Sequence, residues 1–241
     1  VECAAAVTYP LAGVRAAFCD PARRGGGRRV FDPRAYSPPF DFLLELAAAV
    51  PMTGAKVAPG IPHALVPAGA EAEWISDEGE VKEAALWFGP LATAARRATL
   101  LPSGATITTE GARLECGPLG RYLYEPDGAV IRSHLVAEAG RSLGARLIDP
   151  EIAYLTADSL TATPFAKAYE ITDSFGFSLK RLRAVLRAQD VGTVTIKKRG
   201  SALDPATLRR QLRLSGSREA TVVLTRVAGA PTVLLCQPAA G

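Results

Sequence analysis

The sequence predicts a mixed α/β protein in two parts. The first is an open sheet of parallel strands closed by an antiparallel hairpin, and the second is a smaller α+β domain. Three observations support this. Short apolar runs alternate with a helical segment in the first 60 residues, and two strand-like segments then flank a turn. In the last third, strands alternate with helices that begin at capping residues.

The first part follows the order strand, helix, strand. Residues 13–19 form an apolar run that ends at Asp20 and fits a buried parallel strand. The pair Ser37-Pro38 predicts an N-cap followed by proline in the first turn, and thus a helix over 40–50. Residues 55–58 form a second short strand, which Pro59 and Gly60 end.

A hairpin closes the first sheet. Residues 70–76 and 80–88 are strand-like and flank the short Asp/Gly turn at 77–79, which predicts an antiparallel pair. Parallel strands with an antiparallel strand at one side are common in mixed sheets. The following residues, 98–120, are predicted to be a linker that holds one or two short strands.

The second part begins at Arg121, and its elements predict helices over one antiparallel sheet. Ser178 and Asp204 precede two of the helices as N-caps, and proline follows Asp204 at the first helical position. The predicted elements are a helix at 128–143, strands at 153–156, 166–173 and 193–197, helices at 179–188 and from 204, and a terminal hairpin of 220–227 with 232–236.

Composition excludes several classes of protein. The sequence contains no apolar run of 18 residues and no signal peptide, so a cytoplasmic protein without membrane spans is expected. The four cysteines stand singly and apart from the two histidines, so no metal site is expected. The sequence does not begin with Met and enters strand-like sequence early, which predicts a protein truncated at its N-terminus.

Charge is distributed unevenly along the chain. Residues 1–120 hold 11 Lys and Arg against 13 Asp and Glu, whereas residues 165–241 hold 13 against 5. A basic surface on one part of a protein suggests a polyanionic partner. Ordinary solvated helix faces are the alternative, and charge alone does not separate the two.

The sharpest local motif is Asp20-Pro21-Ala22-Arg23-Arg24, directly after a predicted strand. Ligands of open α/β sheets bind beyond the carboxyl ends of the strands. A carboxylate there can accept a hydrogen bond from an amine or take up a proton, and the proline fixes the turn. The alternative is an acidic residue that merely ends a strand.

Three blocks of sequence extend this motif and carry a family resemblance. They are residues 20–39, residues 56–62 and residues 73–89. Together they resemble a bacterial family of class I S-adenosylmethionine (SAM)-dependent methyltransferases that carry a C-terminal THUMP-like domain. Residues 193–200 and 220–227 are similar to that domain, so the resemblance covers nearly the whole chain.

The resemblance implies a fold and a division into domains. It implies the C-terminal half of a Rossmann-like methyltransferase sheet followed by an α+β, ferredoxin-like and THUMP-like part. The boundaries expected are 1–97 for the methyltransferase part, 98–120 for the linker, 121–164 for a small ferredoxin-like segment and 165–241 for the THUMP-like domain.

The resemblance also implies site residues and a cofactor, SAM. Asp20 and Pro21 would be catalytic, positioning or deprotonating the methyl acceptor. The residues implied in substrate binding are Arg23, Arg24, Tyr36 and His63. The motif departs from the Asn/Asp-Pro-Pro-Tyr/Phe pattern of amino-methylating enzymes at Ala22 and Arg23, which puts base N-methylation by stacking in doubt.

Much of a SAM site is missing from the sequence. No glycine-rich turn follows a first strand, and no acidic residue follows a second strand for the ribose. Residues 3–7 are Ala-rich and carry no carboxylate where such enzymes often place one near the adenine. We therefore expect this chain to bind SAM poorly and to be inactive alone.

The resemblance implies RNA as the partner of the basic last third, because THUMP domains in general bind RNA. A basic face would neutralise phosphates without reading sequence. The residues predicted to bind RNA are Lys197, Lys198, Arg199, Arg209 and Arg210. A non-catalytic RNA-binding protein with a degenerate methyltransferase fold is the alternative function, and a structural or dimerising module the alternative role for the domain. The sequence does not indicate the oligomeric state.

Overall fold

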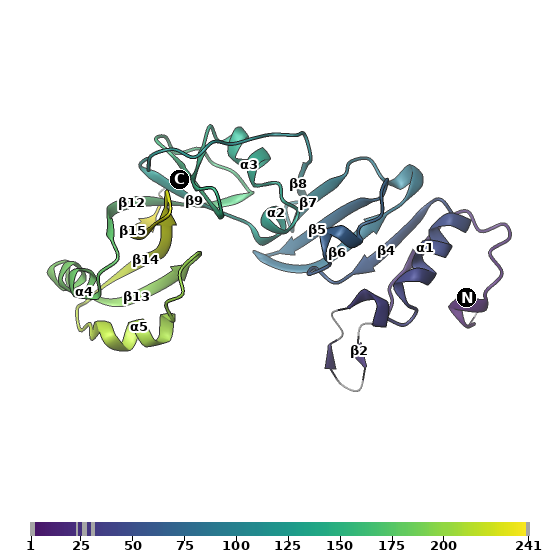
Figure 1. Ribbon diagram of the computed structural model, residues 1–241, viewed down its shortest axis with the longest axis horizontal. Coiled ribbons are helices and arrows are strands. Elements are labelled where there is room, and N and C mark those ends of the chain that lie inside the picture. Colours follow the sequence, from purple (N-terminus) through teal and green to yellow (C-terminus); the bar gives the residue numbers. More distant parts are fainter. Residues whose placement is uncertain (1–2, 23, 26–27, 30–31, 240–241) are drawn as a thin grey trace. The chain divides into compact units, whose positions relative to one another are not determined.

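The computed structural model describes residues 3–22, 24–25, 28–29 and 32–239. The chain divides into two compact units, and each is described by itself. Unit 1 comprises residues 1–111 and 127–138, and unit 2 comprises residues 112–126 and 139–241. Figure 1 follows the chain through both units.

Unit 1 is built on a six-stranded sheet (Figure 1). In spatial order its strands are β1 (Ala17–Cys19), β4 (Thr53–Val57), β6 (Glu80–Trp87), β5 (Glu71–Asp77), β7 (Arg96–Leu101) and β8 (Ala105–Thr108). Outside the sheet lie the short strands β2 (Arg24–Gly25) and β3 (Arg28–Arg29) and the 3-10 turns η1 (Ala6–Thr8), η2 (Pro33–Ala35), η3 (His63–Leu65) and η4 (Gly89–Leu91).

Strand direction confirms the predicted sheet of parallel strands closed by an antiparallel hairpin. β1 and β4 run parallel, and β6 lies antiparallel between β4 and β5. The turn between β5 and β6 consists of Glu78 and Gly79, both with positive φ, as a two-residue hairpin turn requires.

One expectation for unit 1 needs correction. The first strand was expected to be buried over 13–19, but only Ala17–Cys19 is a strand, it lies at the sheet edge, and Phe18 is 63% exposed. The short strands expected within the linker at 98–120 form as β7 and β8. β7 pairs in parallel with β5, and β8 pairs with β7, so both strands join the sheet.

Helix α1 (Phe40–Ala49) packs against β1 and β4. Its buried residues Phe40, Leu43 and Leu46 recur every three residues and therefore share one face. The helix was expected to begin at a Ser37 cap. The helix begins instead after Pro39, whose side chain makes no capping hydrogen bond. Ser37 pairs with Ala22 through backbone hydrogen bonds.

The helix expected at 128–143 is interrupted. The structure forms α2 (Gly128–Arg132) and α3 (Val136–Ser142), separated by His134 in a left-handed conformation with a φ of 59°. Asp127 caps α2 through the Ala129 N–H, and α2 packs against β5, β6 and β7 of unit 1. The sequence gives no sign of this break, because residues 129–139 contain neither proline nor glycine.

Unit 2 is built on a seven-stranded sheet (Figure 1). In spatial order its strands are β10 (Arg146–Asp149), β11 (Ile152–Ala157), β9 (Tyr122–Pro126), β12 (Ala166–Gly176), β15 (Ala230–Pro238), β14 (Arg218–Val227) and β13 (Val191–Lys198). All pairs are antiparallel except β13 with β14. The predicted layout of helices over one sheet is confirmed, with β9 and β10 as strands that were not predicted and with β13 parallel to β14 rather than antiparallel.

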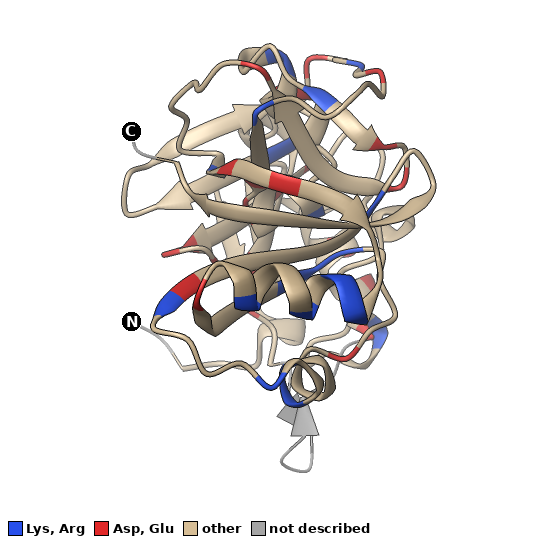
Figure 2. Cartoon of the chain, turned by 90° about the vertical axis from the view of Figure 1, so that its left-hand side faces the viewer, with Lys and Arg blue, Asp and Glu red and all other residues tan. Residues whose placement is uncertain are grey.

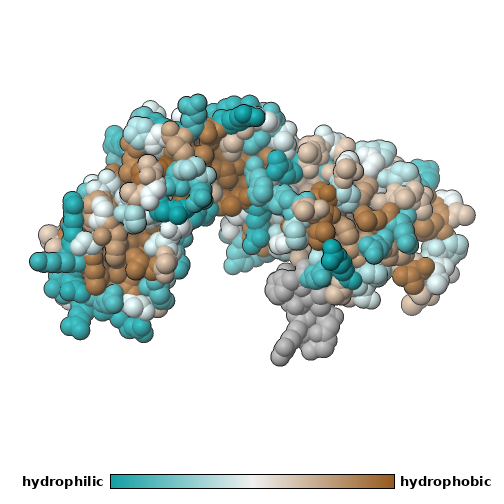
Figure 3. Space-filling model, in the orientation of Figure 1, coloured by the Kyte–Doolittle hydropathy of each residue, from teal (hydrophilic) through white to brown (hydrophobic). Residues whose placement is uncertain are grey.

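Two helices cover one face of this sheet. They are α4 (Leu179–Ala188) and α5 (Pro205–Leu212), capped by Ser178 and Asp204 as the sequence predicts. Their leucines, among them Leu182 and Leu212, pack onto Val194 and Leu224 of β13 and β14. Figure 3 shows brown surface gathered over strands of this unit, with teal residues around it.

The other face of the sheet has its own core, because β10 approaches β14 and the sheet curls over. The Ala228 N–H donates to the Ile148 carbonyl at 2.9 Å, and Gly229 N–H donates to the Asp149 carboxylate at 2.8 Å. The residues enclosed on this side are Leu123, Ile148, Ile152, Tyr154, Tyr169, Val223, Leu234 and Cys236.

In the part of the chain that the structure describes, no helix combines the length and the apolar character needed to cross a bilayer.

A buried carboxylate holds β5 to the start of β7. Glu71 is 1% exposed, and its Oε2 accepts from the backbone N–H groups of Thr93 (2.7 Å) and Ala94 (2.9 Å). Its Oε1 accepts from Arg97 Nε at 2.6 Å. Burial raises the pKa of the Glu71 carboxyl, but the hydrogen bonds from Arg97, Thr93 and Ala94 outweigh burial and hold it below its usual value.

We expect Glu71→Gln to lower the free energy of unfolding by about 3 kcal/mol at pH 7, because it leaves Arg97 without a charged acceptor. Because the folded-state pKa of Glu71 lies below its ordinary value, this stabilisation is complete above that value and is lost as the pH falls through the folded-state pKa. The difference between wild type and variant, measured by urea denaturation, should therefore shrink as the pH falls below about 4.5.

The control is Glu80→Gln, which removes a carboxylate from an exposed surface pair with Lys82. It should leave the urea midpoint unchanged. An equal loss in both variants would contradict the assignment of Glu71.

Candidate functional site

Asp20 lies where the sequence placed it, at the carboxyl end of β1. Cys19 pairs in parallel register with Ala55, so β1 and β4 end at the same edge of the sheet. The Asp20 side chain is 57% exposed, whereas Pro21 beside it is buried. Parallel strands bring their carboxyl ends together at the edge where such sheets bind ligands.

Lys56 is the cation that faces Asp20. Its Nζ lies 4.0 Å from the Asp20 carboxylate and 2.5 Å from the carboxylate of Glu83 on β6. Alternation along the strands places these three side chains on one face of the sheet. Lys56 and Glu83 were missed as site residues, although the register of β4 with β6 could have indicated them once the hairpin was predicted.

The thiol of Cys19 is next to this carboxylate. Burial raises its pKa first, and the negative charge of Asp20 raises it further. The thiol form therefore dominates at neutral pH.

The segment after Pro21 returns to the sheet through two contacts. Ala22 and Ser37 exchange backbone hydrogen bonds of 2.8 and 3.1 Å. Tyr36 is 4% exposed, and its hydroxyl accepts from the Ala58 N–H at 3.3 Å. Tyr36 was predicted to bind substrate; the structure buries it, where it anchors the Asp-Pro segment against the end of β4.

The two arginines of the motif have no described side chains. Arg23 lies outside the described residues. Arg24 begins β2, which pairs with β3 as a small ribbon, and only its backbone belongs to the described part of the chain.

His63, the fourth residue predicted to bind substrate, packs within unit 1. Its ring stacks on Trp74 with centroids 4.8 Å apart and on His134 with centroids 3.8 Å apart. Its Nε2 lies 2.8 Å from the Arg132 carbonyl. Burial lowers the pKa of His134, and the charges of His63 and Arg96 lower it further, so a neutral ring is favoured in the stack.

A glycine brings two aromatic rings together on the Asp20 face of the sheet. Phe18 and Trp87 lie on either side of Gly54 with ring centroids 6.2 Å apart. A Cβ at position 54 would lie 2.6 Å from Cζ3 of Trp87 and 3.0 Å from Cδ2 of Phe18. The close packing of these rings thus depends on glycine at this position.

The predicted RNA-binding residues of β13 separate onto two faces. Successive side chains of a strand point to opposite sides. Val194 and Ile196 pack beneath the helices, so Lys198 shares the helix side, whereas Lys197 and Arg199 point to the curled side. The sequence hypothesis had placed all three beside the helix arginines.

Lys197 and Arg199 make contacts within unit 2. Lys197 Nζ donates to the Glu125 carboxylate at 2.6 Å, and the Tyr169 hydroxyl donates to the same oxygen at 3.3 Å. Burial lowers the pKa of Lys197, but hydrogen bonds with Glu125 and Tyr169 outweigh burial and raise it. Arg199 lies over the ring of Tyr154 at 4.9 Å. Burial raises the pKa of Tyr154 to about 12, so its hydroxyl stays protonated.

Helices α4 and α5 carry the basic face. Their sequences contain no Asp or Glu. In Figure 2 helix α4 faces the viewer, and its Lys and Arg residues are blue. The basic residues of the two helices are Lys180, Arg181, Arg183, Arg187, Arg209 and Arg210, and Arg213 follows α5 directly. Arg209 also donates to the Val194 carbonyl at 3.4 Å, which holds it against β13.

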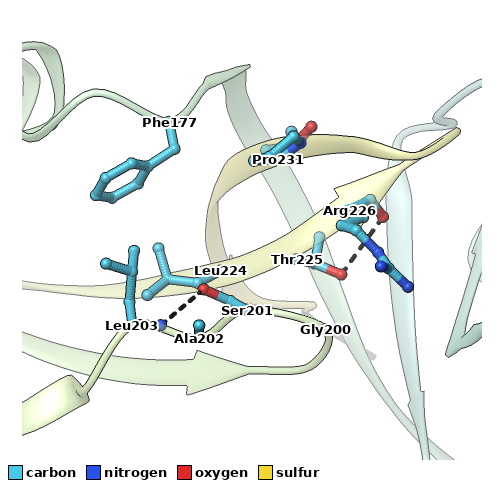
Figure 4. A pocket seen from close by; sticks show the side chains of 10 residues that line it. Phe177, Gly200, Ser201, Ala202, Leu203, Leu224, Thr225, Arg226 and Pro231 are labelled. Atoms are coloured by element: carbon cyan, nitrogen blue, oxygen red, sulfur yellow. Dashed lines mark hydrogen bonds between the residues drawn. The ribbon is translucent and has the colours of Figure 1, made fainter.

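A hollow of about 320 Å³ lies next to residues 200–203, which precede the N-terminal end of α5 (Figure 4). Phe177, Leu203, Leu224 and Pro231 give it apolar walls, and a hydrogen bond of 3.3 Å from the Leu203 N–H to Ser201 Oγ shapes its floor. Among the residues that the structure describes, no group of three His, Cys, Asp or Glu side chains could hold a metal ion.

Unit 1 is an open α/β sheet with Asp20 at the carboxyl end of one of its parallel strands. The crystal structure of a protein described as a methyltransferase, from Porphyromonas gingivalis W83, superposes with a TM-score of 0.76 at 22% identity. The superposition covers 92% of this chain and 59% of that protein, so the chain spans less than two thirds of its length. Residues 166–238 match the family model described as THUMP domain-like.

Two relatives from Mycobacterium tuberculosis, strains CDC 1551 / Oshkosh and H37Rv, are each described as an uncharacterized S-adenosylmethionine-dependent methyltransferase. Each is 39% identical over 247 residues, and the match covers 98% of this chain and 68% of the relative. The chain belongs to this family of SAM-dependent methyltransferases with a C-terminal THUMP-like domain.

The opposite orientations of Lys197 and Lys198 can be tested by stability. Lys197→Met should lower the free energy of unfolding of unit 2 by about 1–2 kcal/mol, because Glu125 then keeps a half-buried charge without its cation. Lys198→Met should leave it unchanged, because Lys198 is exposed. Urea denaturation of the two variants makes the comparison, and equal effects would contradict the assignment of faces.

Proposed function

We propose that this chain is part of a SAM-dependent methyltransferase that acts on RNA, with the acceptor group positioned by Asp20 and Pro21. The observation that supports this most directly is the exposed Asp20 carboxylate at the shared carboxyl edge of two parallel strands. The relatives described as SAM-dependent methyltransferases supply the reaction type.

In this proposal Asp20 accepts a hydrogen bond from the acceptor and aligns its lone pair with the methyl donor. Positioning contributes most of the rate in such a transfer, and proton uptake contributes a further part. Lys56 orients the carboxylate, since its ammonium lies between Asp20 and Glu83. Pro21 leaves its carbonyl free as a second acceptor and fixes the turn.

SAM would supply an electrophilic methyl group. The described residues at the edge formed by β1 and β4 offer a carboxylate and an amine, and the sequence lacks the glycine-rich turn that lets such a cofactor approach the backbone. We therefore propose that the chain binds SAM weakly by itself, as the sequence predicts.

RNA is proposed as the substrate class because of unit 2. Its THUMP-like match covers the strands and helices that carry the basic face. Phosphate neutralisation by Lys198 and the arginines of α4 and α5 would hold RNA without sequence readout. Lys197 and Arg199 would support this surface from the curled side of the sheet.

The basic face alone would equally suit a non-catalytic RNA-binding protein, the second candidate function. The two differ in whether Asp20 matters for methyl transfer. Crosslinking of the full-length protein to cellular RNA identifies the RNA in either case, and only the enzyme should show transfer of labelled methyl groups to it.

We expect Asp20→Asn in the full-length protein to lower kcat for methyl transfer by roughly 100-fold or more, because the carboxylate acts on the acceptor in the transition state. RNA affinity should not change, since Asp20 lies in unit 1. Transfer of labelled methyl groups and RNA anisotropy measure the two quantities. Glu80→Gln, in the β5–β6 hairpin, is the control, and equal activity of both variants would refute the role of Asp20.

A further inference from the structure

A second hollow of unit 2, of about 540 Å³, lies between α4 and the C-terminal end of α5. We propose that it binds a phosphate group of the RNA backbone. This inference rests on the proposed RNA binding and assigns it to one place. The hollow is lined by Arg183, Thr207, Arg210, Gln211 and Arg213.

Three guanidinium groups converge here without a carboxylate to balance them. α4 and α5 contain no acidic residue, and none of the three arginines forms an ion pair among the described residues. The two acids that flank the helices have other partners: Asp204 accepts from the N–H groups of Ala206 and Thr207, and Asp190 from Ser217. The hollow therefore holds a positive charge that only a ligand or solvent can balance.

The arginines retain free donors. Arg183 uses one Nη2–H on the Gln211 carbonyl at 2.5 Å, while its Nε is buried without a hydrogen-bond partner in the described structure. A buried N–H without an acceptor costs free energy, and a bound anion or water commonly supplies the acceptor. Arg210 uses one donor on Thr207 Oγ1 at 3.1 Å, and Arg213 has none of its donors committed to a described residue.

The end of α5 at this hollow would by itself repel an anion, because its last carbonyl groups carry partial negative charge. Two arginines of α4 reduce this effect. Arg183 donates to the Gln211 carbonyl, and Arg187 donates to the Arg213 carbonyl at 2.9 Å. The carbonyl groups are thus capped, and the same contacts fix α4 and α5 as the two walls of the hollow.

The chemistry favours a phosphate oxyanion. A guanidinium presents two parallel N–H groups that match two oxygens of a phosphate, and the Thr207 hydroxyl can add a further donor. The hollow is broad and open to solvent, which suits a group carried on a chain that crosses the surface rather than an enclosed small molecule. The apolar hollow in Figure 4 lacks a comparable set of cations.

The test replaces arginine with lysine, which keeps the positive charge but removes the two parallel N–H groups of the guanidinium. A specific phosphate site should lose affinity, whereas binding by positive charge alone should not. The variants are Arg210→Lys and Arg213→Lys, and the matched control is Arg218→Lys, an exposed arginine at the start of β14 outside the hollow. Fluorescence anisotropy of a single-stranded RNA, with the whole 241-residue chain, gives the affinities.

We expect each hollow variant to weaken RNA binding by about 5-fold or more, through the lost bidentate bond, and the control by less than about 2-fold. Arg213→Ala should also reduce the slope of log affinity against log salt by roughly 0.7, the value for one phosphate contact on a single strand. Equal RNA affinities of the two hollow variants and the Arg218→Lys control would overturn the proposal. They would leave intact the proposal that RNA binds through another surface.

Inorganic phosphate is the second probe. NMR signals of the arginine Nε–H groups should shift for Arg183, Arg210 and Arg213 as phosphate is added, and RNA should produce the shift at lower concentration. Shifts with phosphate that RNA neither causes nor reverses would show a site for a free anion and overturn the assignment to RNA. An absence of RNA binding by the wild-type chain would refute both this inference and the RNA part of the proposed function.

Discussion

The parallel pairing of β1 with β4 determines where chemistry can take place in unit 1. It brings Asp20 to the same sheet edge as the end of β4 and sets it beside Lys56. Two described contacts near the motif support this edge. Tyr36 fixes the returning segment beneath Ala58, and Ala22 pairs with Ser37. Without the pairing of β1 with β4, the position of the Asp20 side chain relative to Lys56 would not be fixed.

Unit 2 follows a different constraint, the need to fill both faces of one sheet. Two helices cover one face, and the curl of β10 toward β14 closes the other. The curled side takes in polar groups, which is possible because Glu125, Lys197 and Tyr169 satisfy one another. The two lysines of β13 therefore differ in role. Lys197 bonds to Glu125 within the sheet, whereas Lys198 remains exposed on the surface.

Sequence patterns predicted the elements of both sheets except β9 and β10, because periodicity, caps and turns are local. Ser178, Asp204 and the Glu78-Gly79 turn each fixed a boundary that the structure reproduces. Features that depend on distant residues were not predicted. The stack of His63 on His134 lies at the break of a helix that looks continuous in the sequence, and the buried Tyr36 accepts a hydrogen bond from the distant Ala58. The position of Asp20 could be predicted, but its partner Lys56 required the strand register.

Gly54 has a consequence for how the sequence of this family can vary. The rings of Phe18 and Trp87 occupy the space above the glycine, so any larger residue there would force one ring aside. Positions 54 and 87 are therefore coupled: a relative with a side chain at 54 should carry a smaller residue opposite it on β6. The substitutions that β4, the strand of Lys56, can accept are thus limited by Trp87 on the neighbouring strand β6.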